Sequence, residues 1–199
     1  GFDNVCFLKA RIQDLSLDLE RLDHWFGGQV ISDLAGWQQM EEMIRGWRVE
    51  QPLVADSSID IVVSNCVLNL VHPGDRRKLF GEVARVLKPG GRAVISDIVS
   101  DSDVPEHMQQ DLALWSGCVS GAFREDRFLE AFAAEGLVEV EVVQRQSEPW
   151  TVVEGIEFRS VTVRAVSPER PGTLFDSIEL PAIMPQDESS CCDPGGDCC

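Results

Sequence analysis

The chain has 199 residues, of which 34 are acidic and 17 basic, so its formal net charge is −17. Nucleic acids and anionic membranes bind basic surfaces, and this charge therefore excludes both classes of partner. The length suits one domain with a substantial core, and the 44% of hydrophobic residues is typical of a globular protein. We find no apolar stretch long enough to span a bilayer and no secretory leader, which predicts a cytoplasmic monomer.

The cysteines carry the most chemical information in the sequence. There are seven, an odd number, with Cys6, Cys66 and Cys118 scattered. The others form two adjacent pairs at the very end: Cys191, Cys192, Cys198 and Cys199. This is not the framework of a disulfide-rich secreted protein, and the lack of a C-x-x-C pair or clustered histidines argues against structural zinc. Thiolates select soft ions, whereas a lone cysteine is more often a small buried hydrophobe.

The amino-terminal part predicts one strand and one helix. Residues 5–8 (VCFL) form an apolar run of strand length. Residues 16–52 form a long segment of mixed polar and apolar residues. In its second half, apolar residues recur at helical spacing: Leu34, Trp37, Met40, Ile44 and Trp47. This spacing predicts an amphipathic helix over residues 33–48, with Ser32 as its N-cap and its tryptophans in the core.

The central part predicts a strand-helix-strand unit. Residues 59–63 are a β-branched run typical of a buried parallel strand. A helix over residues 73–87 follows, the Lys-Pro-Gly-Gly turn at 88–91 stops it, and residues 92–97 form the next strand. Ligands of open α/β sheets bind beyond the carboxyl ends of such strands, so Cys66, just after the first strand, is a functional candidate.

The carboxy-terminal part predicts further elements and then a tail. Pro105 can open a third helix that carries Cys118 toward its end, and the small residues at 116–122 suit close approach to a ligand. A fourth helix and two strands follow at residues 125–135, 137–145 and 158–166. We therefore expect one domain over residues 1–166, with an unusual insertion at 16–56. Residues 167–199 should form an extended, disordered acidic tail that contains proline and cysteine.

Several runs closely resemble arsenite methyltransferases. They are residues 60–70 (DIVVSNCVLNL), 82–91 (EVARVLKPGG), 95–98 (ISDI) and 114–122 (LWSGCVSGA), and the resemblance also covers 5–15 and 158–165. The Lys-Pro-Gly-Gly portion is common to many S-adenosylmethionine-dependent methyltransferases. The SNCVxNL run combined with the SGC run is specific to the arsenite enzymes.

This resemblance implies an α/β fold with a Rossmann-like class I methyltransferase sheet. It implies that Cys66 and Cys118 are the catalytic residues, because they bind trivalent arsenic as thiolates while its lone pair attacks the sulfonium methyl of S-adenosylmethionine. The substrate would be arsenite or its thiol adducts, the role arsenic detoxification, and the reductant a thiol such as glutathione or thioredoxin. Apart from the resemblance, the terminal cysteines are candidates for further arsenic ligands, and a disordered redox-active end is the alternative: Cys191, Cys192, Cys198 and Cys199.

The resemblance also implies a cofactor site. Ala10, Arg11 and Ile12 would line the adenine of S-adenosylmethionine. Ser64 and Asn65 would contact its methionine end, so that one strand exit holds both reactants.

The sequence departs from the family pattern at its amino-terminal side. It lacks the family's glycine-rich loop, the acid that binds the ribose and an upstream arsenic-binding cysteine. We therefore expect the carboxy-terminal portion of such an enzyme, with the first two strands missing from the middle of its sheet. Such a portion should be inactive by itself and should not bind S-adenosylmethionine. The alternatives are a methyltransferase for a small organic molecule and a non-catalytic arsenic-binding chain.

Overall fold

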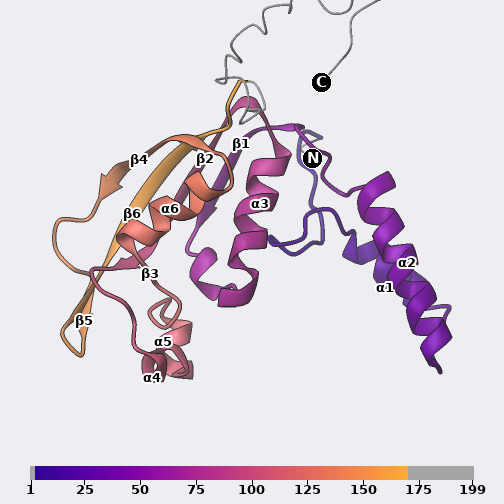
Figure 1. The fold of residues 1–199 in the computed structure, drawn as a ribbon, viewed down its shortest axis with the longest axis horizontal. Helices are drawn as coiled ribbons and strands as arrows, with labels where there is room; N and C mark the ends of the chain where they lie inside the picture. Colours follow the sequence, from indigo (N-terminus) through magenta and orange to yellow (C-terminus); the bar gives the residue numbers. More distant parts are fainter. Residues whose placement is uncertain (1–2, 170–199) are drawn as a thin grey trace, which may run out of the picture.

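A computed structural model describes residues 3–169, which form a mixed sheet with helices α3 and α6 on one face (Figure 1). The expectations for residues 170–199, including the four terminal cysteines, lie outside the described residues. The helices are α1 (Leu19–Phe26), α2 (Leu34–Glu50), α3 (Arg76–Val86), α4 (Glu106–Gln109), α5 (Leu112–Ser116) and α6 (Glu125–Ala134), with single 3-10 turns η1 (Leu68–Leu70) and η2 (Pro73–Asp75). The strands are β1 (Ile59–Asn65), β2 (Leu87–Ser100), β3 (Phe123–Arg124), β4 (Val138–Arg145), β5 (Thr151–Val153) and β6 (Ile156–Val166).

The sheet has the order β1-β2-β6-β4, with β3 paired to β2 and β5 paired to β6. β1 and β2 are parallel and α3 connects them, which is the expected strand-helix-strand unit. β6 runs antiparallel to both β2 and β4. Within residues 3–169, β1 pairs only with β2, so the described sheet ends there. The carboxyl ends of β1 and β2 lie side by side, because Asn65 is in register with Ser96.

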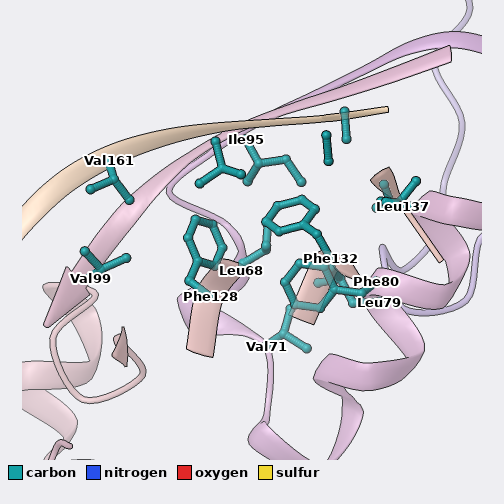
Figure 2. Close-up of a cluster of buried hydrophobic side chains, with 14 of the residues drawn as sticks. Leu68, Val71, Leu79, Phe80, Ile95, Val99, Phe128, Phe132, Leu137 and Val161 are labelled. Carbon is teal, nitrogen blue, oxygen red and sulfur yellow. The ribbon is translucent and has the colours of Figure 1, made fainter. Parts of the chain in front are cut away.

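The main core lies between the sheet and helices α3 and α6 (Figure 2). α3 contributes Phe80, whose ring lies edge-to-face with Phe132 of α6 at a centroid distance of 4.9 Å. Phe132 makes a similar contact with Phe128, one helical turn earlier. The three rings are at most 1% exposed. Their packing joins the two helices and holds both against the sheet.

The strand expected over residues 5–8 is not formed. This segment is extended but unpaired, and the side chain of Phe7 is 93% exposed. A β-strand is stable only when a neighbouring strand accepts and donates its backbone hydrogen bonds. Among the described residues, no strand offers this segment a partner, because the free edge of β1 does not pair with it.

The insertion contains two helices where one was expected, α1 and α2. Asp33, rather than Ser32, caps α2, because its carboxylate accepts a hydrogen bond from the backbone N–H of Gly36 at 2.8 Å. The prediction that the α2 tryptophans lie in the core is wrong for Trp37, which is 49% exposed. The two helices lie beside the sheet rather than on it (Figure 1), and the guanidinium of Arg21 in α1 lies 4.0 Å from the ring centroid of Trp47 in α2. No helix in the described part of the chain combines the length and apolarity needed to cross a bilayer.

Two further expectations need correction. The helix predicted from Pro105 is divided into α4 and α5, because the Asp111 carboxylate restarts it by accepting backbone N–H groups at the first turn of α5. The Lys-Pro-Gly-Gly segment at 88–91 does end α3, but it belongs to β2 rather than to a turn. Gly90 and Gly91 are bonded to the backbone of Ser167, which extends the pairing of β2 past the end of β6.

We expect Phe80→Ala to lower the free energy of unfolding by about 3–5 kcal/mol, because it removes a buried ring and leaves a cavity between α3 and α6. The matched control is Phe7→Ala, which truncates a ring that is 93% exposed and should change stability by no more than about 0.5 kcal/mol. Urea unfolding followed by far-UV circular dichroism measures both values. Equal losses in the two variants would contradict the location of the core.

Candidate functional site

Cys66 lies immediately beyond the carboxyl end of β1. Its backbone N–H donates to the carbonyl of Ser96 at 2.9 Å, which extends the ladder between β1 and β2 by one bond. The chain then turns sharply into η1, and Cys66 adopts a φ of +54°. Its side chain is exposed, and its thiol donates to the Oδ1 atom of Asn65 at 3.4 Å. The strand end therefore presents a thiol and an amide to solvent together.

Cys118 occupies an equivalent position in a second turn, at the end of α5. Its φ is +60°, its side chain is half-buried, and its carbonyl accepts a hydrogen bond from the side-chain amide of Asn69 at 3.2 Å. A left-handed conformation is unfavourable for a residue with a Cβ and persists only where the surrounding structure enforces it. Both cysteines are thus held in unusual backbone geometry by the packing around them.

The carboxylate of Asp97 organises this end of the sheet. It is 1% exposed and accepts hydrogen bonds from the backbone N–H groups of Leu68 at 2.9 Å and Asn69 at 3.4 Å. Its other oxygen accepts from the N–H of Ile98 at 2.8 Å. Burial raises the pKa of this carboxyl, and the three backbone donors partly offset the effect. Asp97 therefore fixes the first turn of η1 to the end of β2.

The two thiols interact electrostatically with Asp97 and with each other. Burial raises the pKa of the Cys66 thiol, and the carboxylate of Asp97 raises it further. The pKa of Cys118 is also raised, first by burial, then by Asp97, then by the charge of Cys66. The thiolate forms are therefore less populated at neutral pH than that of a free cysteine. A ligand that bonds to sulfur and displaces its proton overcomes this disadvantage.

The structure brings only part of the predicted site together. Cys66 and Cys118 converge, and Ser64 and Asn65 directly precede Cys66 at the strand end. The Ser64 hydroxyl is buried without a hydrogen-bond partner in the described part of the chain, so it fits a role as a ligand contact. Within residues 3–169, no group of three or more His, Cys, Asp or Glu side chains is arranged to hold a metal ion.

The residues predicted to line adenine lie elsewhere in the described part of the chain. Ile12 packs partly against the main core, and Ala10 is half-buried. Arg11 lines a different cavity of about 650 Å³, formed with α2 and α3 and bordered also by Arg48 and Lys78. Their role as cofactor ligands stays a prediction.

Sequence reasoning missed the residues that support the thiols. Asp97 and Asn69 lie within the runs that resemble the family, but the sequence patterns assign no supporting role to them or to Arg76. Arg76 donates to the carbonyls of Gly121 at 2.7 Å and Val71 at 3.3 Å. One feature of the sequence could have indicated Asp97. It follows an apolar run at the end of a predicted strand, where a carboxylate has to be either exposed to solvent or hydrogen-bonded.

Within the loop at 116–122, Gly121 approaches the backbone of η1 closely. A Cβ atom on Gly121 would lie 1.9 Å from the carbonyl oxygen of Asn69. This position therefore requires glycine for packing, and it sets how closely the Cys118 loop lies against η1.

We expect Gly121→Ala to destabilise the protein by about 1–3 kcal/mol, because the added methyl group overlaps the backbone of η1. Gly117→Ala is the control in the same loop, since a Cβ there would meet only ordinary contacts at 3.6 Å or more. Thermal unfolding monitored by circular dichroism compares the two. If Gly117→Ala proved as harmful as Gly121→Ala, the close approach would not be the cause.

We expect Asp97→Asn to lower the pH at which Cys66 and Cys118 become reactive. Removing a negative charge favours the thiolates, so their pKa values fall and alkylation near neutral pH becomes faster. The amide retains an oxygen that can accept from η1. The measurement is iodoacetamide alkylation against pH, resolved by peptide mass spectrometry, with Asp60→Asn at the opposite end of β1 as control. Superimposable pH profiles for wild type and Asp97→Asn would contradict the coupling.

Comparison with known proteins gives three findings. A family model described as a methyltransferase domain matches residues 46–136. The arsenite methyltransferase of Halobacterium salinarum is 38% identical over 92 residues, which is 46% of this chain and 23% of that protein. The arsenite methyltransferase of Mus musculus is 44% identical over 69 residues, 35% of this chain and 18% of that protein.

Among solved structures, an arsenic(III) S-adenosylmethionine methyltransferase from Chlamydomonas reinhardtii matches with a TM-score of 0.47 and 29% identity. The match covers 62% of this chain and 42% of that one. The chain thus spans about a quarter or less of the length of the two curated relatives above. The expected fold class, a Rossmann-like class I methyltransferase sheet, is confirmed. On these matches, residues 46–136 are similar to a methyltransferase domain, and the chain is similar to arsenite methyltransferases over the region that it shares with them.

Proposed function

We propose that the protein containing this chain transfers a methyl group from S-adenosylmethionine to trivalent arsenic held by Cys66 and Cys118. One observation carries the proposal. Two cysteines from segments about fifty residues apart in the sequence are brought to one sheet end, because Cys66 bonds to the carbonyl of Ser96 in β2 and the nearby Asn69 amide donates to the carbonyl of Cys118 at 3.2 Å. Two thiols with restricted backbones are suited to a soft, thiophilic element and have no use in ordinary packing.

The thiol chemistry follows from the raised pKa values. When arsenite binds, each new As–S bond replaces an As–O bond, and the thiol proton leaves with the hydroxyl group as water. The low thiolate population is therefore no obstacle, since the proton is consumed in ligand exchange. Burial, and after it the carboxylate of Asp97, raises the pKa of both thiols and favours their protonated forms, which are less open to oxidation.

The transfer itself requires alignment rather than a base. Arsenic(III) bound to two thiolates retains a lone pair, which attacks the methyl carbon in line with the departing sulfur. The As–C bond forms from that lone pair, and the electrons of the C–S bond leave with the sulfur. Holding both reactants in this geometry is the main contribution that the protein can make.

S-adenosylmethionine would supply the activated methyl group. Ser64 and Asn65 are the residues of this chain that support its placement beside Cys66, because one carries an unpaired buried hydroxyl and the other an exposed amide. Donors and acceptors of this kind suit the amino-acid end of the cofactor. A thiol reductant such as glutathione or thioredoxin would keep the cysteines reduced, and the reaction would serve arsenic detoxification.

The test is a methyl-transfer assay on the complete protein with arsenite, a thiol and S-adenosylmethionine, followed by chromatography of arsenic species. We expect Cys66→Ser and Cys118→Ser each to lower the rate by about 100-fold or more, because arsenic loses its fixed orientation. Cys6→Ser, at an exposed thiol, should leave the rate unchanged.

Full activity in both site variants would refute the proposed site. Turnover of a small organic acceptor without any response to arsenite would instead support an organic-substrate methyltransferase. Stoichiometric arsenite binding without methylated product would support the non-catalytic binding protein.

A further inference from the structure

The segments that carry the two thiols are connected through three consecutive residues of β2. The carbonyl of Ser96 accepts the backbone N–H of Cys66 at 2.9 Å. The carboxylate of Asp97 accepts the N–H groups that begin η1. The carbonyl of Ile98 accepts the side-chain amide of Asn69 at 2.6 Å. One end of a strand therefore anchors both the Cys66 turn and the Asn69 side chain.

The same amide of Asn69 reaches the second thiol segment. Its Nδ2 atom donates to the carbonyl of Cys118 at 3.2 Å as well as to that of Ile98. Asn69 is 1% exposed, so water does not compete for these bonds. One side chain thus joins the Cys118 turn to the strand end that also fixes Cys66.

We propose that Asn69 is a positioning residue that sets the separation of the Cys66 and Cys118 thiols for a bridging trivalent arsenical. This inference deepens the proposed function and rests on it for the identity of the ligand. The backbone of Cys118 has a left-handed φ, and its N–H donates to the carbonyl of Trp115 at 3.0 Å within the loop. The bond from Asn69 to the Cys118 carbonyl is the contact that ties this turn to η1 and β2. If the bond is lost, the turn can relax and carry the thiol away from Cys66.

The rest of the loop has an independent attachment. Arg76 donates to the carbonyl of Gly121 at 2.7 Å, and its guanidinium lies 4.4 Å from the ring centroid of Phe123. Removing the Asn69 amide should therefore release the Cys118 turn while the end of the loop near Gly121 stays in place. This separates positioning of the thiol from folding of the loop.

The side-chain oxygen of Asn69 also supports the positioning role. Its Oδ1 atom is buried and has no hydrogen-bond partner within the described residues. A buried acceptor without a partner is unfavourable, so this oxygen contributes nothing to stability. The contribution of the side chain lies in its two donor bonds, and one of them ends on Cys118.

The test uses the full chain with serine at Cys6, Cys191, Cys192, Cys198 and Cys199. Dibromobimane becomes fluorescent when it joins two neighbouring thiols, and phenylarsine oxide binds two thiols together. Asn69→Asp keeps the shape but cannot donate, and Asn69→Ser is smaller and neutral. Gln109→Ala is the matched control, because Gln109 also donates its side-chain amide to a backbone carbonyl, that of Val104 at 2.7 Å.

We expect both Asn69 variants to cross-link about tenfold more slowly and to bind phenylarsine oxide about tenfold more weakly, as the loss of one such bond allows. Monobromobimane, which needs only one thiol, should react with Asn69→Ser at nearly the wild-type rate, and with Asn69→Asp more slowly because the added carboxylate favours the protonated thiols. Thermal unfolding should remain cooperative, and Gln109→Ala should match wild type in every assay.

Unchanged cross-linking in the Asn69 variants would overturn the positioning role, and so would the loss of cooperative unfolding in both, since the residue would then act in folding. Slower cross-linking in the Asn69 variants together with no phenylarsine oxide binding to the parent chain would keep the positioning role and remove the arsenical ligand. Failure of the parent chain to cross-link at all would overturn both.

Discussion

The buried carboxylate of Asp97 is the constraint on which the candidate site depends. A charged group that is 1% exposed is stable only if backbone dipoles replace its water, and here three N–H groups do so. Two of them open η1, so the chain after β1 has to turn back over the end of β2. That turn places Cys66 at the strand exit and turns Asn69 toward the Cys118 loop. One desolvated charge thus determines where both thiol segments meet.

The aromatic core and the site occupy different parts of the same sheet. Rings from α3 and α6 cover one face, and this packing fixes the strands whose carboxyl ends carry the site (Figure 2). The side chains of Ile61 and Val63 are exposed. The described residues therefore only half-bury one side of β1 and leave its apolar residues on the other side in contact with solvent. The strand is thus not the buried one that its β-branched run predicts. Stability comes from the covered side, and chemistry is confined to the strand ends.

Local patterns predicted the elements that this packing requires. α3, α6, β4 and β6 follow from apolar periodicity, because their buried faces lie against one another. The strand predicted at 5–8 is not formed, because a strand needs a neighbouring strand to pair with, and a local sequence pattern does not show whether one is present. The prediction that Trp37 is buried is wrong, because amphipathicity shows that a helix has an apolar face but not whether a sheet or another helix covers that face. The resemblance identified both cysteines, whereas Asn69, Arg76 and Asp97 act through contacts between distant segments.

The electrostatics of the site favour ligand exchange over nucleophilic catalysis. A catalytic cysteine normally lies near a cation that lowers its pKa, but both thiols here interact with a carboxylate that raises it. Such thiols react slowly with carbon electrophiles at neutral pH. In the proposed function a trivalent arsenic centre would differ, because its hydroxyl ligands would take up the thiol protons as the As–S bonds form. The same carboxylate that fixes η1 in place therefore also selects against nucleophilic chemistry at carbon and leaves a pair of thiols suited to a soft, oxygen-ligated element.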